Sequence, residues 1–141
     1  MITAKNLSKS FDDIQAVRDL TLSIAEEQVF GLIGTNGAGK STLLRLVAGI
    51  YRPDQGSIEV DGRASYDNPA AKRDLFFIPD DPYFFLNASA EDMGDYYGAV
   101  YPSFDKGRFG ALLSDFGLDA KRSTRGYSKG MKKQLDRKSV V

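Results

Sequence analysis

Residues 34–42 read Gly34, Thr35, Asn36, Gly37, Ala38, Gly39, Lys40, Ser41 and Thr42. Two glycines followed by lysine and serine stand here at the spacing of a phosphate-binding loop. Glycines let backbone amides turn inward around an anion, and the start of a helix adds partial positive charge. Lys40 supplies a full charge for terminal phosphates, and the Ser41 hydroxyl is a ligand for Mg²⁺. The stretch therefore predicts a site for a nucleoside triphosphate with its magnesium ion.

The segments on either side of this loop support the same interpretation. Residues 29–33 form a short continuous apolar run, which predicts a buried strand of a parallel sheet. After the loop, apolar residues recur at helical spacing: Leu43, Leu46, Val47 and Ile50. A buried strand, a glycine-rich loop and an amphipathic helix in that order are the context in which the motif binds phosphate.

The rest of the first half is rich in predicted strands, and the second half is helical. Even spacing of apolar residues predicts a strand over 17–24, and shorter strands are predicted at 57–60 and 75–78. A turn at 53–56 and a hairpin-type turn at Asp61–Gly62 separate them. Ser89 with Asp92 predicts the capped start of one helix, and the periodicity of residues 109–116 predicts a second helix that Gly117 closes.

Composition restricts the class of protein. The 141 residues are 42% hydrophobic and 27% charged, with 19 basic and 19 acidic residues, which indicates a globular chain without a net pull towards nucleic acid. Residues 121–141 are locally basic, with eight basic residues against Asp136 alone. The absence of cysteine and histidine excludes thiolate and imidazole ligands and a histidine base. No segment approaches the roughly 20 apolar residues of a membrane span, so we expect a cytoplasmic location.

Four motifs together resemble those of ATP-binding cassette (ABC) proteins. Residues 34–43 resemble their Walker A loop, and residues 127–131 resemble their signature motif, commonly Leu-Ser-Gly-Gly-Gln. Ser128 and Gly130 keep that pattern, whereas Lys129 and Met131 depart from it. Phe11 stands where the family has an aromatic residue that stacks on adenine, and Asp80 occupies the glutamine position of the Q-loop.

The resemblance implies an α/β fold of the P-loop NTPase class, namely an ABC-type nucleotide-binding domain. It implies an antiparallel β region at the N-terminus, a helical subdomain at about 86–128 and a domain that is partial over residues 1–135. The implied ligands are ATP and Mg²⁺, with Ser41 and Asp80 facing the metal. The implied partners are a second nucleotide-binding domain, identical or not, whose ATP meets Ser128, Lys129 and Gly130, and a membrane-spanning transporter subunit. The chain would then lie peripherally at the inner face of the cell membrane, in a transporter of the bacterial exporter or drug-response type.

Several of these residues also allow a plainer interpretation. Phe11 could be a core residue, and Asp80 and Asp81 could be turn residues before Pro82. Aromatic residues 83–85 belong either to the core or to a surface that contacts a membrane subunit. Two other functions stay open: a nucleotide-binding interaction module without catalysis, and an ABC-type ATPase that acts on the ribosome or on DNA.

The resemblance also implies groups that do not occur among these residues. Family members place an Asp-Glu pair after the signature motif and a histidine later, and these groups position Mg²⁺ and the attacking water. We therefore expect this chain to bind ATP without hydrolysing it, and we expect a domain that is incomplete at its C-terminal side. Residues 136–141 depart from the family pattern, and their reverse translation permits GAT CGG AAG AGC GTC GTG, which resembles a sequencing adapter. We interpret them as a non-native tail.

Overall fold

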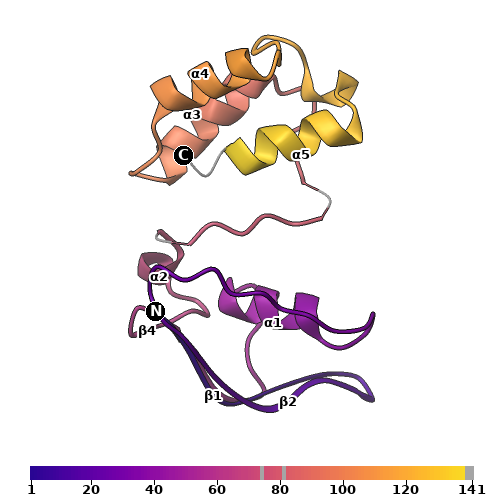
Figure 1. Cartoon of the computed structure of the whole chain (residues 1–141), viewed down its shortest axis with the longest axis vertical. Coiled ribbons are helices and arrows are strands. Elements are labelled where there is room, and N and C mark those ends of the chain that lie inside the picture. The colour runs from indigo at the N-terminus through magenta and orange to yellow at the C-terminus, as the bar shows by residue number, and fades with distance from the viewer. Residues whose placement is uncertain (74, 81, 139–141) are drawn as a thin grey trace. The chain divides into compact units, whose positions relative to one another are not determined.

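The computed structural model describes residues 1–73, 75–80 and 82–138. The chain divides into two compact units, Met1–Leu75 and Phe76–Val141. The first unit combines a sheet with helices, and the second is helical, as Figure 1 shows. Within the described ranges, every helix is too short or too polar to cross a lipid bilayer.

The first unit contains an antiparallel sheet of four strands: β1 (Ile2–Phe11), β2 (Ile14–Ile24), β3 (Gln55–Val60) and β4 (Arg63–Ala64). Their order across the sheet is β2-β1-β3-β4. The strands predicted at 17–24 and 57–60 are confirmed as parts of β2 and β3, and the turn at Asp61–Gly62 joins β3 to β4. The spacing of apolar residues did not predict β1.

Helix α1 (Lys40–Val47) lies against one face of this sheet (Figure 1). Leu43 and Leu46, on the inner side of α1, pack with Ala4, Leu7, Val17 and Ile58 of the strands. Removing these side chains from water stabilises the layer of helix on sheet. The helix predicted after the glycine-rich loop is thereby confirmed. A short helix, α2 (Pro69–Arg73), follows β4.

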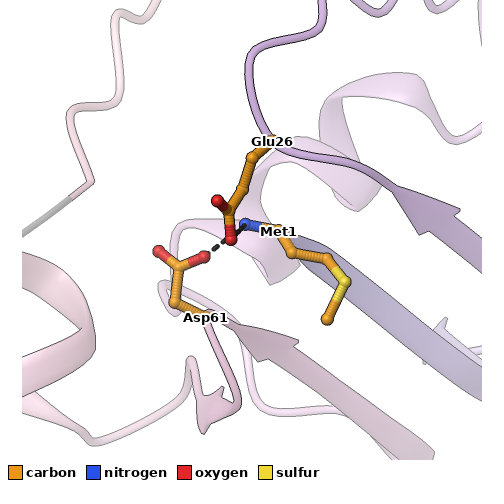
Figure 2. Close-up of polar contacts among 3 residues, drawn as sticks. All are labelled: Met1, Glu26 and Asp61. Carbon is orange, nitrogen blue, oxygen red and sulfur yellow. Dashed lines mark hydrogen bonds and ion pairs between the residues drawn. The ribbon is translucent and has the colours of Figure 1, made fainter.

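The amino group of Met1 ties the start of β1 to two neighbouring segments (Figure 2). It forms an ion pair with the Asp61 carboxylate in the turn after β3, and it lies 3.7 Å from a carboxylate oxygen of Glu26. The hydrogen bond to Asp61 and the nearby negative charges raise the pKa of the Met1 ammonium. The Asp61 amide also donates a hydrogen bond to the Met1 carbonyl (2.8 Å), so the end of β3 is held from both sides.

Two predicted buried strands are wrong. Residues 29–33 are not a strand in this structure, and Val29 and Ile33 are fully exposed. Residues 75–78 are also irregular, with Ile78 exposed. A strand requires a neighbour that accepts and donates its backbone hydrogen bonds. No described strand pairs with either segment, so an apolar run alone does not produce one here.

The second unit contains α3 (Ala90–Val100), α4 (Lys106–Asp115), a 3₁₀ turn (Thr124–Gly126) and α5 (Lys129–Lys138). The two helices predicted in this region are confirmed as α3 and α4, and Gly117 with a positive φ follows α4. Residues of α3, α4, α5 and the segments between α4 and α5 form a shared core: Ala90, Phe109, Leu113, Leu118, Tyr127 and Leu135. A smaller cluster of Ala88, Met93 and Tyr97 extends this core.

The predicted capping pair at the start of α3 is confirmed. The Ser89 hydroxyl accepts a hydrogen bond from the Asp92 amide (3.1 Å), and an Asp92 carboxylate oxygen accepts one from the Ser89 amide (2.8 Å). These two bonds satisfy amides that the helix itself leaves unpaired. The backbone and hydroxyl hydrogen bonds from Ser89 lower the pKa of Asp92.

We expect Ser89→Ala to lower the free energy of unfolding of the second unit by about 1 kcal/mol at pH 7. Because the pKa of Asp92 is lowered in the folded state, its contribution is present at neutral pH and lost as pH falls through that pKa. The difference between wild type and variant should therefore shrink in strong acid. Thermal unfolding at pH 7 and pH 3 measures it, with Ser103→Ala, in the loop after α3, as the control. An equal effect of both variants would contradict the capping role.

Helix α5 continues into the predicted tail. Its last three residues, 136–138, belong to that tail, whereas residues 139–141 lie outside the described residues. Asp136 is buried, and its Oδ2 atom has no hydrogen-bond partner among the described residues. Burial raises the pKa of the Asp136 carboxyl. A buried carboxylate without a partner is unfavourable, which makes Asp136 a poor fit to its position.

We expect Asp136→Ala to stabilise the second unit, by about 1–3 kcal/mol at pH 7, because it removes an unsatisfied buried group. Because the pKa of Asp136 is raised in the folded state, the folded state binds the proton more tightly than the unfolded state. The free-energy cost of burying the charged Asp136 carboxylate therefore grows as pH rises from acid to neutral. The gain should therefore be larger at pH 7 than at pH 4. Denaturant unfolding at both values tests this, and a loss of stability at pH 7 would show that Asp136 has a favourable role.

Candidate nucleotide-binding site

The glycine-rich loop joins α1 at a position that only glycine can occupy. Gly39 has φ of 82° and forms the N-cap of α1. A β-carbon at this position would lie 2.1 Å from the carbonyl oxygen of Ala16 in β2. Both the left-handed backbone and the close approach of β2 exclude a side chain. The fold thus holds the end of the loop directly against β2.

At the end of the loop, three backbone amides donate no hydrogen bond to a described residue of the chain. No described residue accepts a hydrogen bond from the amides of Gly39, Lys40 or Ser41. Free amides at a helix start attract an anion, and the dipole of α1 adds partial positive charge at the same point. The arrangement suits a phosphate group, as the motif predicts.

Lys40 lies over the loop that it terminates. Its Nζ atom donates hydrogen bonds to the carbonyl oxygens of Gly34 (2.8 Å) and Thr35 (2.7 Å). An ammonium group has three donors, so one remains for a ligand oxygen while the other two keep the loop closed. The two hydrogen bonds therefore hold the lysine and the loop together.

A cavity of about 230 Å³ adjoins this loop. Ala38, Gly39 and Lys40 line it from the loop side, and β2 contributes Ala16, Val17 and Arg18. The remaining lining is apolar: Leu20, Leu32, Ile33 and Leu43. The cavity combines an apolar wall with the positive charges of Lys40 and Arg18, which is the character expected of a nucleotide site.

Phe11 ends β1 at the hairpin that leads into β2. It is exposed to 38%, so it is not a core residue of the first unit. Its ring contacts that of Tyr51, which follows α1, with 5.1 Å between ring centroids. Sequence reasoning did not identify Tyr51, because the two residues lie 40 positions apart and no local pattern links them.

The two candidate ligands of Mg²⁺ lie in different units. Ser41 is exposed in the first turn of α1, in the first unit, and Asp80 is exposed in the second unit. Asp81 lies outside the described residues. Over the described parts of the chain, no three acidic residues gather into a metal-binding group. The Ser41 hydroxyl beside the loop remains the group that fits a phosphate-bound magnesium ion.

The signature residues begin α5. The Ser128 hydroxyl accepts a hydrogen bond from the Met131 amide (3.2 Å) and so caps the helix. Tyr127 is buried, and its hydroxyl donates to the Asp119 carbonyl (2.7 Å), which anchors the preceding residue. Ser128, Lys129 and Gly130 are exposed. A β-carbon at Gly130 would meet only the Ser128 hydroxyl, at 3.8 Å, so the fold of this chain does not require a glycine there.

A second cavity, of about 250 Å³, lies within the second unit. Residues 82–87 form one side of it, and Thr124, Arg125 and Lys132 form the other. Tyr83 and Leu86 are 80% and 82% exposed, and the rings of Phe85 and Tyr96 meet edge-on at 4.9 Å. Phe84, in contrast, packs against the core of this unit. The aromatic stretch 83–85 is therefore divided between core and surface.

Comparison with known proteins agrees with these motifs. The family model described as ABC transporter matches residues 17–136. The chain is 33% identical over 135 residues to the ABC transporter ATP-binding protein YtrB of Bacillus subtilis (strain 168), covering 96% of this chain and 46% of that relative. It is 33% identical over 146 residues to the ABC transporter ATP-binding protein NatA of the same organism, with 96% and 59% covered.

A solved structure described as the ATP-binding subunit of an ABC transporter shares the fold, with a TM-score of 0.89 and 26% sequence identity. The match covers 99% of this chain and 60% of the solved one. The chain thus spans about half the length of the curated relatives that it matches. The predicted α/β fold of the P-loop NTPase class is confirmed. The chain therefore belongs to the ABC transporter family, with the fold of its ATP-binding subunits.

Proposed function

We propose that this chain is part of the ATP-binding subunit of an ABC transporter and that it binds MgATP at residues 34–42. The single observation that carries this proposal is the closed loop at the start of α1. Gly39 packs against β2, Lys40 bridges two loop carbonyls, and neighbouring amides point to no acceptor of the chain. The phosphates occupy the free amides, Lys40 compensates their charge, and Ser41 contributes an oxygen ligand to Mg²⁺. Phe11 stacks on the adenine ring.

We further propose that the subunit acts in a dimer of nucleotide-binding domains. Ser128, Lys129 and Gly130 are exposed at the start of α5, where helix amides and a lysine favour an anion. The space around Gly130 supports close approach of a group from outside this chain. In the dimer that group is the terminal phosphate of the ATP held by the opposite domain.

The membrane-spanning subunit is the second proposed partner. The exposed side chains Tyr83, Phe85, Leu86 and Tyr96 form an apolar surface beside the cavity of the second unit. Exposed apolar patches of this kind commonly mark interfaces. Contact there would place the subunit at the inner face of the membrane. We expect Tyr83→Ser with Phe85→Ser to abolish co-purification of the chain with the membrane-spanning transporter subunit.

The proposed ATP site is tested by Gly39→Ala, with Gly31→Ala as the matched control. A β-carbon at Gly39 meets the Ala16 carbonyl, whereas one at Gly31 meets nothing within 4 Å. We expect Gly39→Ala to weaken MgATP binding at least about tenfold, because the loop must leave its position against β2. Gly31→Ala should bind as wild type does. Titration with a fluorescent ATP analogue, chased with unlabelled ATP, measures both, and failure of wild type to bind would refute the proposed function.

A further inference from the structure

The segment that follows α1 is fixed to the end of β1 by Asp54. One carboxylate oxygen of Asp54 accepts a hydrogen bond from Lys9 Nζ (2.7 Å), and the other accepts one from the Ser10 amide (2.7 Å). The Asp54 amide in turn donates to the Ser8 carbonyl (3.0 Å). The hydrogen bonds from Lys9 and Ser10 lower the pKa of Asp54, so the carboxylate is charged at neutral pH. Three bonds thus hold Asp54 against the last residues of β1.

Tyr51, three residues earlier, reaches the residue that ends β1. The rings of Tyr51 and Phe11 meet at 68° with centroids 5.1 Å apart, a favoured edge-to-face geometry. Lys9 Nζ lies over the Phe11 ring, 5.4 Å from its centroid, within the range of a cation–π contact. The Lys9 side chain is only 16% exposed, because it lies between Asp54 and the ring. Phe11 is therefore held from two sides.

These contacts connect the two ends of the proposed nucleotide site. Helix α1 begins at Lys40, beside the phosphates, and the chain that leaves it carries Tyr51 and Asp54. Tyr51 also packs against the core formed by α1 and the sheet, so its ring is not free to follow a mobile Phe11. The arrangement fixes the Phe11 ring relative to the helix that binds phosphate.

We infer that Tyr51, Lys9 and Asp54 are positioning residues for the base of the nucleotide, acting through Phe11. This inference rests on the proposed function, in which Phe11 stacks on adenine. A stacking ring contributes to affinity only when its plane is fixed before the ligand arrives, because ordering it on binding would cost affinity. The three residues supply that order without touching the ligand.

A purely structural role of Tyr51 would have a different signature. If the contact only stabilised the hairpin, its loss would disturb the phosphate loop and the base site alike, because β2 supports Gly39. A positioning role acts on the base alone. MgATP and magnesium tripolyphosphate share the phosphates, and only ATP carries the base, so their affinities separate the two roles.

The experiment measures the affinities of wild type, Tyr51→Leu, Tyr51→Phe and the control Tyr66→Leu for MgATP and for magnesium tripolyphosphate. Protein concentrations are kept below those at which light scattering detects self-association. Tyr66 is an exposed tyrosine of the same unit. We expect Tyr51→Leu to bind MgATP about three- to tenfold more weakly while tripolyphosphate affinity stays unchanged. Tyr51→Phe, which keeps the ring, and Tyr66→Leu should both resemble wild type. Asp54→Asn and Lys9→Met should show a smaller loss of the same kind.

A double-variant cycle provides the decisive result. In a Phe11→Ala background, Tyr51→Leu should have no further effect on MgATP affinity, because the residue through which it acts is gone. Equal loss of ATP and tripolyphosphate affinity in Tyr51→Leu, or a full effect of Tyr51→Leu without Phe11, would overturn the inference and leave the proposed function intact. If wild type bound neither ligand, the proposed function would fail and the inference with it.

Discussion

We expect Lys40→Ala to lower the affinity of this chain for MgATP to below a tenth of the wild-type value. The Lys40 ammonium holds the carbonyls of Gly34 and Thr35 and keeps a donor for the terminal phosphates. A charge-assisted hydrogen bond of this kind contributes about 1.5–3 kcal/mol, which corresponds to a tenfold or larger change in affinity. Loss of the two bonds to the loop carbonyls adds to the effect, because these bonds no longer hold the loop in place.

The control for this variant is Lys5→Ala, which removes one charge from an exposed position of β1 in the same unit. Both variants lose one positive charge and so have the same net charge. Any nonspecific electrostatic attraction of ATP to the chain is therefore reduced equally in the two variants. Titration with a fluorescent ATP analogue should show wild-type affinity for Lys5→Ala and a loss for Lys40→Ala. Equal affinity of the two variants would remove Lys40 from the site.

Local sequence patterns predicted the elements whose signals are local. The motif at 34–42 correctly placed a loop before a helix, and Leu43 and Leu46 are the buried positions of α1. The pair Ser89 and Asp92 marked the start of α3 because both partners of the capping box lie within one turn. In each case the residues that fix the structure lie within a few positions of one another.

Strand β1 was not predicted, because irregular pairing breaks its alternation. Ala4 and Leu7 both face the core, although they are three residues apart and would point to opposite faces of a regular strand. The register with β2 shifts between these two residues, and Asn6 between them has φ of 47°. A bulge of this kind depends on the partner strand, and the sequence of β1 alone does not reveal it.

The sequence predicted the candidate residues around the phosphates, but it predicted only one residue, Phe11, at the proposed site of the base. The roles proposed for Lys40 and Ser41 follow from residue spacing within one loop. The contact of Tyr51 with Phe11, and that of Gly39 with Ala16, join residues from separate elements. Such contacts arise from the packing of α1 on the sheet, which residue spacing does not encode.

Residues 29–33 lead to the last prediction, which concerns self-association. Val29 and Ile33 are fully exposed and Phe30 is half exposed, and the backbone amides of this segment have no described partner. An apolar segment with unpaired backbone groups can pair with the same segment of another copy. We therefore expect the 141-residue chain to self-associate as its concentration rises. Burying two such side chains favours association by about 1.5 kcal/mol or more each, so Val29→Lys with Ile33→Lys should raise the onset concentration roughly a hundredfold.

Light scattering against protein concentration measures that onset. The matched control is Val100→Lys with Phe116→Lys, which replaces two exposed apolar side chains at separate places in the second unit and adds the same charge. Since added positive charge alone opposes association in both double variants, only the difference between them reports on residues 29–33. The segment is responsible if its variant stays monomeric where the control associates. Equal onset concentrations would show that association begins elsewhere, and that exposure of residues 29–33 has no such consequence.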